Sequence, residues 1–328
     1  MRGWGLSGTR QHRNRIVSPG SSLSDLRPPP ERDPNRERSV QHPARGHLRC
    51  PLALGESAIW HEDEQVLYFT DILGKLLHRH DPATGLTVVV LRGETVAGLT
   101  IQTDGSLLLF QAAGRISRYT GGRTVPVRPD IAEDHDTRFN DVFADPEGRV
   151  YCGTMPGPDR SGRLYQLDPD GSLTTVIEDA GVSNGMGITR DFAHFYHTNT
   201  TRRTITRYPW DRATGDLGEG MVVVRLPADG PDQPDGMTLD AEDGIWSASY
   251  GGGRINHFRP NGSLVGAVTF PAHKITSIAF GGEGFGTAFV TSAEGPGRPK
   301  TGPLAGSLFH FRPGATGKPP FRSRIGLG

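Results

Sequence analysis

Short runs of apolar and aromatic residues, separated by Gly, Asp, Asn and Pro, alternate along most of the chain. Runs such as VLYFT, RVYCGT and GIWSASY have the length and the β-branched and aromatic content of strands. The residues between them favour tight turns. No convincing amphipathic helix of three turns interrupts the series. The pattern therefore predicts an all-β protein built from many short strands.

This pattern of strands and turns repeats six times. Equivalent polar or small residues near the start of each unit are spaced by 42, 42, 44, 51 and 42 residues, by subtraction of neighbouring positions. Repeats of about 40 to 50 residues with four strands each are typical of a β-propeller, whereas two packed β-sandwiches would not require so regular a repeat. We therefore predict a six-bladed β-propeller over residues 47–316. The equivalent positions are Glu56, Gly98, Asn140, Asn184, Asp235 and Ser277.

The two ends of the chain differ from this repeat. Residues 1–46 are rich in Arg and Pro and poor in periodic apolar residues, which predicts a disordered extension. Residues 317–328 are assigned to a C-terminal tail. No apolar run has the length of a membrane span and no signal peptide is evident, so we expect a cytoplasmic protein without a membrane partner.

Composition narrows the class of function. Lys plus Arg and Asp plus Glu both total 36, so there is no overall basic charge to attract nucleic acid. The sequence has no concentrated group of exposed aromatic residues outside the strand pattern, so it implies no protein partner. Cys50 and Cys152 lack the spacing of a zinc site or a disulfide framework, and we expect two unpaired thiols. A small-molecule ligand is favoured.

The propeller gives the repeat positions a chemical meaning. Blades surround a channel, so residues at one repeat position form a ring near one mouth, and Glu56, Asn140, Asn184 and Asp235 are predicted to converge. Two carboxylates brought together need a counter-charge. A divalent cation supplies it, and oxygen ligands suit Ca²⁺, Mg²⁺ or Mn²⁺.

From about residue 47 to 316 the chain resembles the regucalcin/gluconolactonase family of six-bladed propellers. The resemblance rests on an ordered set of motifs: LGESAIW, RFNDVFADPEGRVYCGTM, SNGM, PDGMTLDAEDGIW and the ending TSIAFGG…AFVTSA…PLAGSLF. It implies one divalent metal, calcium first, with magnesium, manganese, zinc or iron as alternatives. It also implies hydrolysis of a sugar lactone.

The resemblance also implies roles for individual residues. Glu56, Asn184 and Asp235 match the metal ligands, and Asp235 is also the implied general base. Arg138 and Asn140 match positions that hold substrate oxygens. In this chemistry the metal polarises the lactone carbonyl and acidifies a bound water, whose proton Asp235 accepts as the water attacks.

The chain departs from the family motifs at three places. The first motif reads GES where the family has GEG, and FNDV replaces the common NDG, so the turns near Glu56 and Asp141 are expected to differ. Regucalcin has a substrate-contacting Glu in the loop after GTM, whereas here the loop after Met155 reads PGPDRSG. Asp159 is the nearest acid, and we do not transfer the role to it.

Each candidate also has a structural explanation. Glu56 and Asp235 sit in local patterns of ordinary turns, and Asn184 could adopt a left-handed turn conformation. Arg138 could pair with Asp136. Asn140 could be a turn former, and Asp141 could order the turn or support the ligands. Asn199 could lie in a turn at a strand end.

Two other patterns are weaker. GVSNG matches the nucleophile elbow formally, but a strand follows it where that motif needs a helix, so we do not expect Ser183 to be a nucleophile. The HRH triplet at 78–80 is expected on the surface. Two further functions stay open: a calcium-binding or scaffold propeller without turnover, and an esterase acting on another cyclic ester, an aryl ester or an organophosphate.

Overall fold

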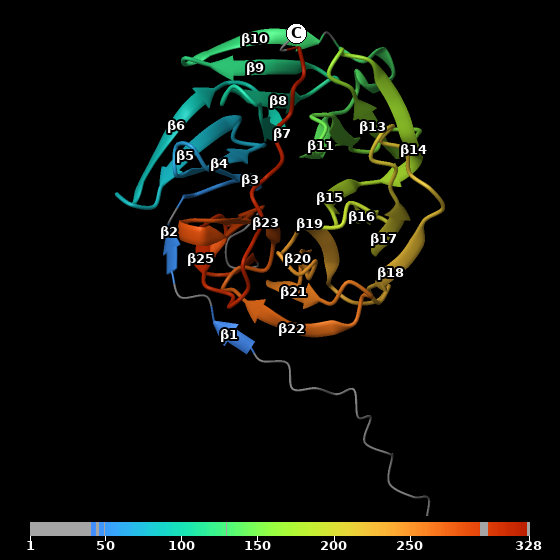
Figure 1. The fold of residues 1–328 in the computed structure, drawn as a ribbon. Coiled ribbons are helices and arrows are strands. Elements are labelled where there is room, and N and C mark those ends of the chain that lie inside the picture. The colour runs from blue at the N-terminus through green and yellow to red at the C-terminus, as the bar shows by residue number, and fades with distance from the viewer. Residues whose placement is uncertain (1–40, 44–45, 49, 129, 296–300, 327–328) are drawn as a thin grey trace, which may run out of the picture. The chain divides into compact units, whose positions relative to one another are not determined.

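The computed structural model describes residues 41–43, 46–48, 50–128, 130–295 and 301–326. Within these residues the fold is nearly all-β, and six small sheets surround a central channel as the blades of a propeller (Figure 1). The predicted six-bladed β-propeller is confirmed. Two short 3-10 turns interrupt the strands: η1 (Ala132–Asp134) and η2 (Glu283–Phe285).

Each blade has four antiparallel strands, and the first of its inner strands in sequence order is innermost. The first three blades are β3 (Gly55–His61), β4 (Val66–Asp71), β5 (Leu76–Asp81) and β6 (Leu86–Arg92); β7 (Val96–Ile101), β8 (Leu107–Gln111), β9 (Ile116–Thr120) and β10 (Arg123–Arg128); and β11 (Phe139–Ala144), β12 (Val150–Thr154), β13 (Gly162–Leu167) and β14 (Leu173–Gly181). Blade four follows the same order: β15 (Ser183–Ile188), β16 (His194–Asn199), β17 (Thr204–Pro209) and β18 (Met221–Arg225).

The last two blades take strands from both ends of the chain. Blade five contains β19 (Gln233–Leu239), β20 (Ile245–Tyr250), β21 (Arg254–Phe258) and β22 (Leu264–Thr269), with β1 (Gln41–Pro43) parallel to β22. Blade six contains β23 (Ile275–Gly281), β24 (Thr287–Ser292) and β25 (Leu308–Phe311), and β2 (Gly46–Leu48) pairs with β25 as its outer strand. The segment expected as a disordered extension therefore contributes β1 and the start of β2, while residues 1–40 lie outside the described residues.

Apolar side chains are buried between neighbouring blades. In the part of the chain that the structure describes, six clusters of buried residues each join two adjacent blades. Between blades six and one, for example, Trp60 stacks on Phe289 with ring centroids 5.6 Å apart. Both cysteines are buried and unpaired, as predicted. Burial of this kind is the main favourable contribution to folding, and here it fixes the blades around the channel.

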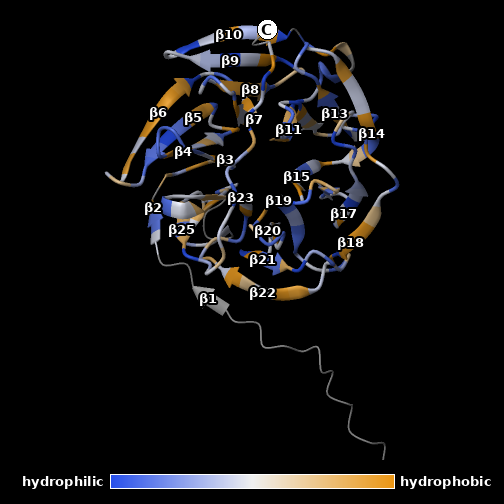
Figure 2. Ribbon diagram, in the orientation of Figure 1, coloured by the Kyte–Doolittle hydropathy of each residue, from blue (hydrophilic) through white to orange (hydrophobic). Residues whose placement is uncertain are grey.

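The outermost strands carry apolar residues as well. Figure 2 shows β6, β18 and β22 as largely hydrophobic. Exposed side chains on them include Leu86, Met221, Val222 and Leu264. In the part of the chain that the structure describes, no helix is long and apolar enough to cross a membrane.

An irregularity recurs in the innermost strand of every blade. The pairing of each of these strands with its neighbour shifts by one residue near its start, which is the signature of a β-bulge. The shifts lie at Glu56/Ile59, Val96/Gly98, Phe139/Val142, Asn184/Met186, Pro234/Met237 and Ile275/Ile278. A bulge re-aims side chains next to it, so the six predicted repeat positions all lie at or beside a change of direction.

The C-terminal segment crosses the other end of the channel, where the inner strands finish (Figure 1). We call residues 316–326 the strap. At one side the carbonyl of Thr316 accepts from the backbone N–H of Ala241. At the other side Ser323 exchanges backbone hydrogen bonds with Ile101 and Thr103. The strap thus joins blades on opposite sides of the channel.

Candidate active site

The predicted ring residues of four blades lie together at the beginnings of the inner strands. Glu56, Asn140, Asn184 and Asp235 are all buried, with exposed fractions of 2 to 6%. Asn140 hydrogen-bonds to Asn184, and Glu56 and Asp235 interact electrostatically. The bulges explain the convergence, because each residue belongs to a different strand that changes direction at this level.

The cluster also contains Arg138 and Asp141, which flank Asn140 in β11 and its approach. Both interact electrostatically with Glu56 and with Asp235. We refer to these six residues as the polar cluster: Glu56, Arg138, Asn140, Asp141, Asn184 and Asp235. Three carboxylates and one guanidinium leave a net charge of −2 when all are ionised.

Hydrogen bonds run through the cluster from blade three to blade five. Arg138 Nη1 donates to Asn140 Oδ1 over 2.6 Å, and Asn140 Nδ2 donates to Asn184 Oδ1 over 3.1 Å. Asn184 Nδ2 donates in turn to Thr200 Oγ1 over 2.8 Å. The Thr200 hydroxyl then donates to the carbonyl of Pro234 over 2.6 Å. The chain of bonds ends beside Asp235, so one network positions both amides and the backbone of the neighbouring carboxylate.

Burial dominates the electrostatics of the cluster. Loss of water raises the pKa of Glu56 well above its usual range, and repulsion from Asp235 and Asp141 adds to the effect. Burial likewise raises the pKa of Asp235 strongly, with a further rise caused by Asp141. Burial raises the pKa of Asp141 to about 7, against the opposing effect of Arg138. A bound cation would stabilise the ionised form of these carboxylates.

Two positions of the ring have no polar role at the cluster. A Cβ atom on Gly98 would lie 2.7 Å from the carbonyl oxygen of Asn140, so only glycine allows blade three to approach this closely. Ser277 lines the cavity below. The ring predicted from the repeat is therefore chemically asymmetric, because the polar cluster occupies blades one, three, four and five.

The turn at Glu56 shows how the chain accommodates its GES motif. Ser57 stands where the family motif has glycine, and its φ of 51° lies in the left-handed region that favours glycine. Its hydroxyl donates to the carbonyl of Ala97 over 2.6 Å. That bond to blade two offsets part of the backbone strain and holds the residue next to Glu56 in place.

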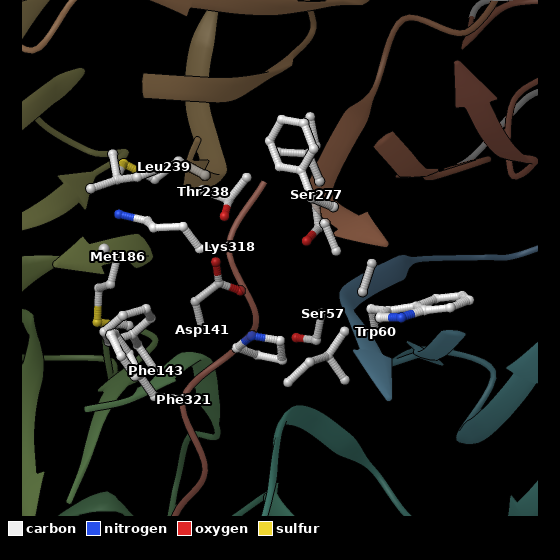
Figure 3. A pocket seen from close by; sticks show the side chains of 18 of the residues that line it. Ser57, Trp60, Asp141, Phe143, Met186, Thr238, Leu239, Ser277, Lys318 and Phe321 are labelled. Atoms are coloured by element: carbon white, nitrogen blue, oxygen red, sulfur yellow. The ribbon is translucent and has the colours of Figure 1, made fainter. Parts of the chain in front are cut away.

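A cavity of about 140 Å³ lies inside the channel between the polar cluster and the strap. Figure 3 shows Asp141 and Ser57 on its wall together with Lys318 and Phe321 of the strap. Lys318 Nζ is held by the carbonyl of Ile188 and by Asp243 Oδ1, at 3.2 and 3.0 Å. The cavity is otherwise lined mainly by apolar side chains, so chemistry is concentrated at the polar end.

The structure separates several alternative explanations. Asp136 pairs with Arg160 rather than with Arg138. Asn199 Oδ1 accepts from the backbone N–H of Arg202, which is the expected strand-end turn. The HRH triplet is not on the surface as predicted: His78 and His80 are both 7% exposed, because His78 stacks on Phe69 of its own blade and His80 lies against Phe289 of blade six. That surface prediction is wrong.

Ser183 of the GVSNG stretch does have a histidine partner. Ser183 Oγ lies 2.8 Å from His197 Nε2, and both residues are buried. Burial lowers the pKa of His197 to about 4, which keeps the ring neutral. β15 and β16 are antiparallel strands, so the strand, turn and helix of a nucleophile elbow are absent at Ser183. The pair instead anchors the residue whose carbonyl accepts from Asn140 Nδ2 over 2.9 Å.

Thr200 is the residue of this site that sequence reasoning missed. It follows Asn199 in a stretch of hydroxyl and amide residues, YHTNTT, that matches ordinary turn composition. Its contacts with Asn184 and with Pro234 cross from blade four to blade five. No spacing rule within one blade could have found that pairing.

The donor set of the cluster fits a hard divalent cation. Glu56, Asn184 and Asp235 offer carboxylate and amide oxygens, which Ca²⁺, Mg²⁺ and Mn²⁺ prefer, and the excess negative charge matches a dication. Among the described residues, no group of three or more His, Cys, Asp or Glu side chains is arranged to hold a metal. An amide oxygen is therefore needed to complete a three-ligand set.

The comparisons with known proteins agree with this architecture. Residues 54–294 match the model of the SMP-30/Gluconolactonase/LRE-like region. The chain belongs to this family. The matched residues begin before Glu56 and end after β24, so they include the whole polar cluster.

Relatives in this family carry lactonase and regucalcin names. The chain is 45% identical over 284 residues to pentonolactonase XacC of Haloferax volcanii, covering 84% of this chain and 96% of that protein. It is 30% identical over 281 residues to regucalcin of Gallus gallus, covering 82% and 94%. The solved regucalcin of Agrobacterium tumefaciens superposes with a TM-score of 0.79 at 23% identity, covering 86% of this chain and 98% of that one. At 23% identity, the likeness to this solved structure concerns the fold alone.

Proposed function

We propose that this protein is a metal-dependent lactonase that opens a sugar lactone by attack of water, with Asp235 as the general base. The observation that carries the proposal is the polar cluster itself, in which the buried carboxylates of blades one and five and the half-buried Asp141 of blade three interact electrostatically beside the Asn184 amide. Buried like charges are costly, so a fold that keeps them has a use for them. The lactonase names of several relatives support the same reaction.

Glu56, Asn184 and Asp235 would hold the cation, with calcium as the first candidate and magnesium, manganese, zinc or iron as alternatives. A divalent cation bound there supplies a more acidic water and withdraws electrons from the lactone carbonyl. It would also return the pKa values of Glu56 and Asp235 toward their usual range, because a positive charge favours the ionised carboxylates.

The Asp235 carboxylate would take the proton of the attacking water as the water oxygen bonds to the carbonyl carbon. The bond between that carbon and the ring oxygen then breaks. The proton that Asp235 took from the water would go to the departing ring oxygen, and the product is the open-chain hydroxy acid. No atoms other than those of one water are consumed.

The donor and acceptor atoms of Arg138 and Asn140 that are still free indicate which substrate groups each side chain would contact. Both N–H groups of Asn140 are used, by Ser183 and by Asn184. Only a lone pair of its Oδ1 remains, which suits a substrate hydroxyl as donor. Arg138 uses Nη1 for Phe139 and Asn140, and within the described residues its Nε and Nη2 have no hydrogen-bond partner. Those donors suit the substrate's oxygens.

The test combines metal binding with turnover. Protein stripped with a chelator is titrated calorimetrically with Ca²⁺, Mg²⁺ and Mn²⁺, and opening of aldonolactones is followed by acid release above the spontaneous rate. We expect binding of one metal and activity that returns with it. Asp211→Asn, a change at an exposed turn carboxylate, is the matched control for Asp235→Asn.

Other outcomes would redirect the assignment. Full activity in the chelated protein or in Asp235→Asn would contradict the mechanism. Metal binding without turnover on aldonolactones, aryl esters and organophosphates would favour a calcium-binding propeller.

A further inference from the structure

We propose that Thr200 is a positioning residue that sets the orientation of the Asn184 amide and thereby the affinity of the site for its cation. Its hydroxyl is buried at the junction of blades four and five and touches both parts of the metal site: Asn184 directly, and the residue before Asp235 through its carbonyl. The inference rests on the proposed function, because it concerns the same metal site.

The direction of the bonds at Thr200 is fixed by chemistry. A hydroxyl has one proton, and the carbonyl of Pro234 can only accept, so that proton is committed to Pro234. The Thr200 oxygen can therefore only accept from Asn184. The atom of Asn184 that faces it must be the amide nitrogen, not the oxygen.

The other end of the network gives the same answer independently. Arg138 has no acceptor atom, so the atom of Asn140 that it contacts must be the oxygen. The amide nitrogen of Asn140 then faces Asn184, and Asn184 must present its oxygen there. Both ends of the chain thus require one orientation of the Asn184 amide, although an amide's two ends have nearly the same shape.

Loss of the Thr200 hydroxyl removes one of these two constraints. In Thr200→Val the amide nitrogen of Asn184 faces a methyl group, and the carbonyl of Pro234 loses its donor. The amide orientation is then set only by Asn140 and by the hydrogen bond of Asn184 to Asp235, and the backbone leading into Asp235 is less firmly held. Partners that orient metal ligands typically contribute about 10- to 100-fold to affinity, and we expect a loss of this size.

Strand β16 contains a matched control two residues away. Thr198 is fully buried, and its Oγ1 has no hydrogen-bond partner in the described chain. Thr198→Val makes the same chemical change within β16, two residues before Thr200 in the sequence, without removing a bond. It is expected to bind metal with the affinity of the unmodified protein.

The experiment measures calcium and manganese affinity of the chelated full-length protein by calorimetry, with thermal unfolding to show that each variant is folded. We expect Thr200→Val to bind about 10- to 100-fold more weakly, while Thr200→Ser, which keeps the hydroxyl, retains binding. Equal affinity of Thr200→Val and the unmodified protein would overturn the inference. An equal loss in Thr200→Ser would also overturn it, because packing of the methyl group would then be responsible.

A second measurement isolates orientation from packing. In Asn184→Asp both side-chain oxygens are equivalent, so there is no amide orientation left to set. The effect of Thr200→Val on affinity should shrink in this background. An undiminished effect would contradict the role in orientation. If the unmodified protein binds no divalent cation, the proposed function fails, whereas normal binding with an unresponsive Thr200 refutes only this inference.

Discussion

The two ends of the channel are built by the same six strands but carry opposite chemistry. At their beginnings the inner strands bring together three carboxylates, two amides and a guanidinium, all of them part-buried or buried. At their ends the same strands present mainly apolar side chains to the strap, whose Phe321 packs beside Phe143 with ring centroids 6.1 Å apart. One end holds unfavourable charge, and the other supplies contacts that hold blades together.

The bulges separate these two ends. A regular strand alternates its side chains strictly, so polar residues facing the channel at its start would continue with every second residue. A one-residue shift after the start breaks this alternation in every blade. The polar end can therefore change without disturbing the register of the apolar end. This difference predicts that variants at one end act on chemistry and variants at the other end act on stability.

The largest effect is expected from Asp235→Asn. The change removes the proposed base and one charged ligand, so kcat for lactone opening should fall by about 10²- to 10⁴-fold. Stability should move the other way: the metal-free protein should unfold at a higher temperature, because a buried carboxylate with a raised pKa has been removed. Steady-state kinetics and calorimetric unfolding measure both. A variant that is both inactive and strongly destabilised would break the proposed division between the ends.

The strap should show the opposite behaviour. Ile325 is 1% exposed and packs in the core between blades two and three. Ile325→Ala should lower the free energy of unfolding by about 2 to 4 kcal/mol, and Ile325→Val by about 1 kcal/mol. Denaturant unfolding measures the loss, and calcium affinity should not change. A graded loss of affinity in the same two variants would show that the strap also shapes the polar end.

His197 predicts a pH dependence of stability. Burial holds its folded pKa at about 4, below the ordinary value of 6.5 that applies to the unfolded chain. Between these values only the unfolded chain takes the proton, so the contribution of His197 to stability should fall by as much as about 3 kcal/mol as pH drops from 6.5 to about 4, while the raised pKa values of Glu56 and Asp235 act in the opposite direction. Urea unfolding at several pH values measures the slope. His197→Gln should flatten it, whereas His135→Gln, at an exposed histidine, should not.

Much of the fold could be predicted because the propeller repeats its local pattern. The spacing of the six units and the alternation within strands such as VLYFT carry the number of blades directly. The closure of blade six by β2 could not be predicted, since Gly46–Leu48 lie beside an Arg- and Pro-rich stretch and gain their partner only from β25, more than 250 residues later. The burial of His78 and His80 was missed for a related reason, because it depends on Phe69 of another strand and on Phe289 of blade six.

In the candidate site, too, features that repeat in each blade could be predicted and contacts between blades could not. Glu56, Asn140, Asn184 and Asp235 could be placed together because they share a repeat position. Thr200 could not, since its bonds run sideways between blades and depend on the bulge that turns Asn184. The roles of all these residues in catalysis and metal binding stay predictions, and the geometry supplies their contacts.

The smallest expected effect is a gain in stability at the polar end. The Thr198 hydroxyl is buried opposite Asn184 in the strand pairing and has no hydrogen-bond partner in the described chain. Replacement by valine keeps the shape and removes an unsatisfied polar group, so Thr198→Val should raise the free energy of unfolding by about 1 kcal/mol. Urea unfolding of the metal-free and calcium-loaded protein tests this. Equal gains in both forms are expected, because this hydroxyl serves no ligand. A gain that disappears with calcium would mean that Thr198 does support the metal site. The residues that serve the cation would then extend beyond the polar cluster.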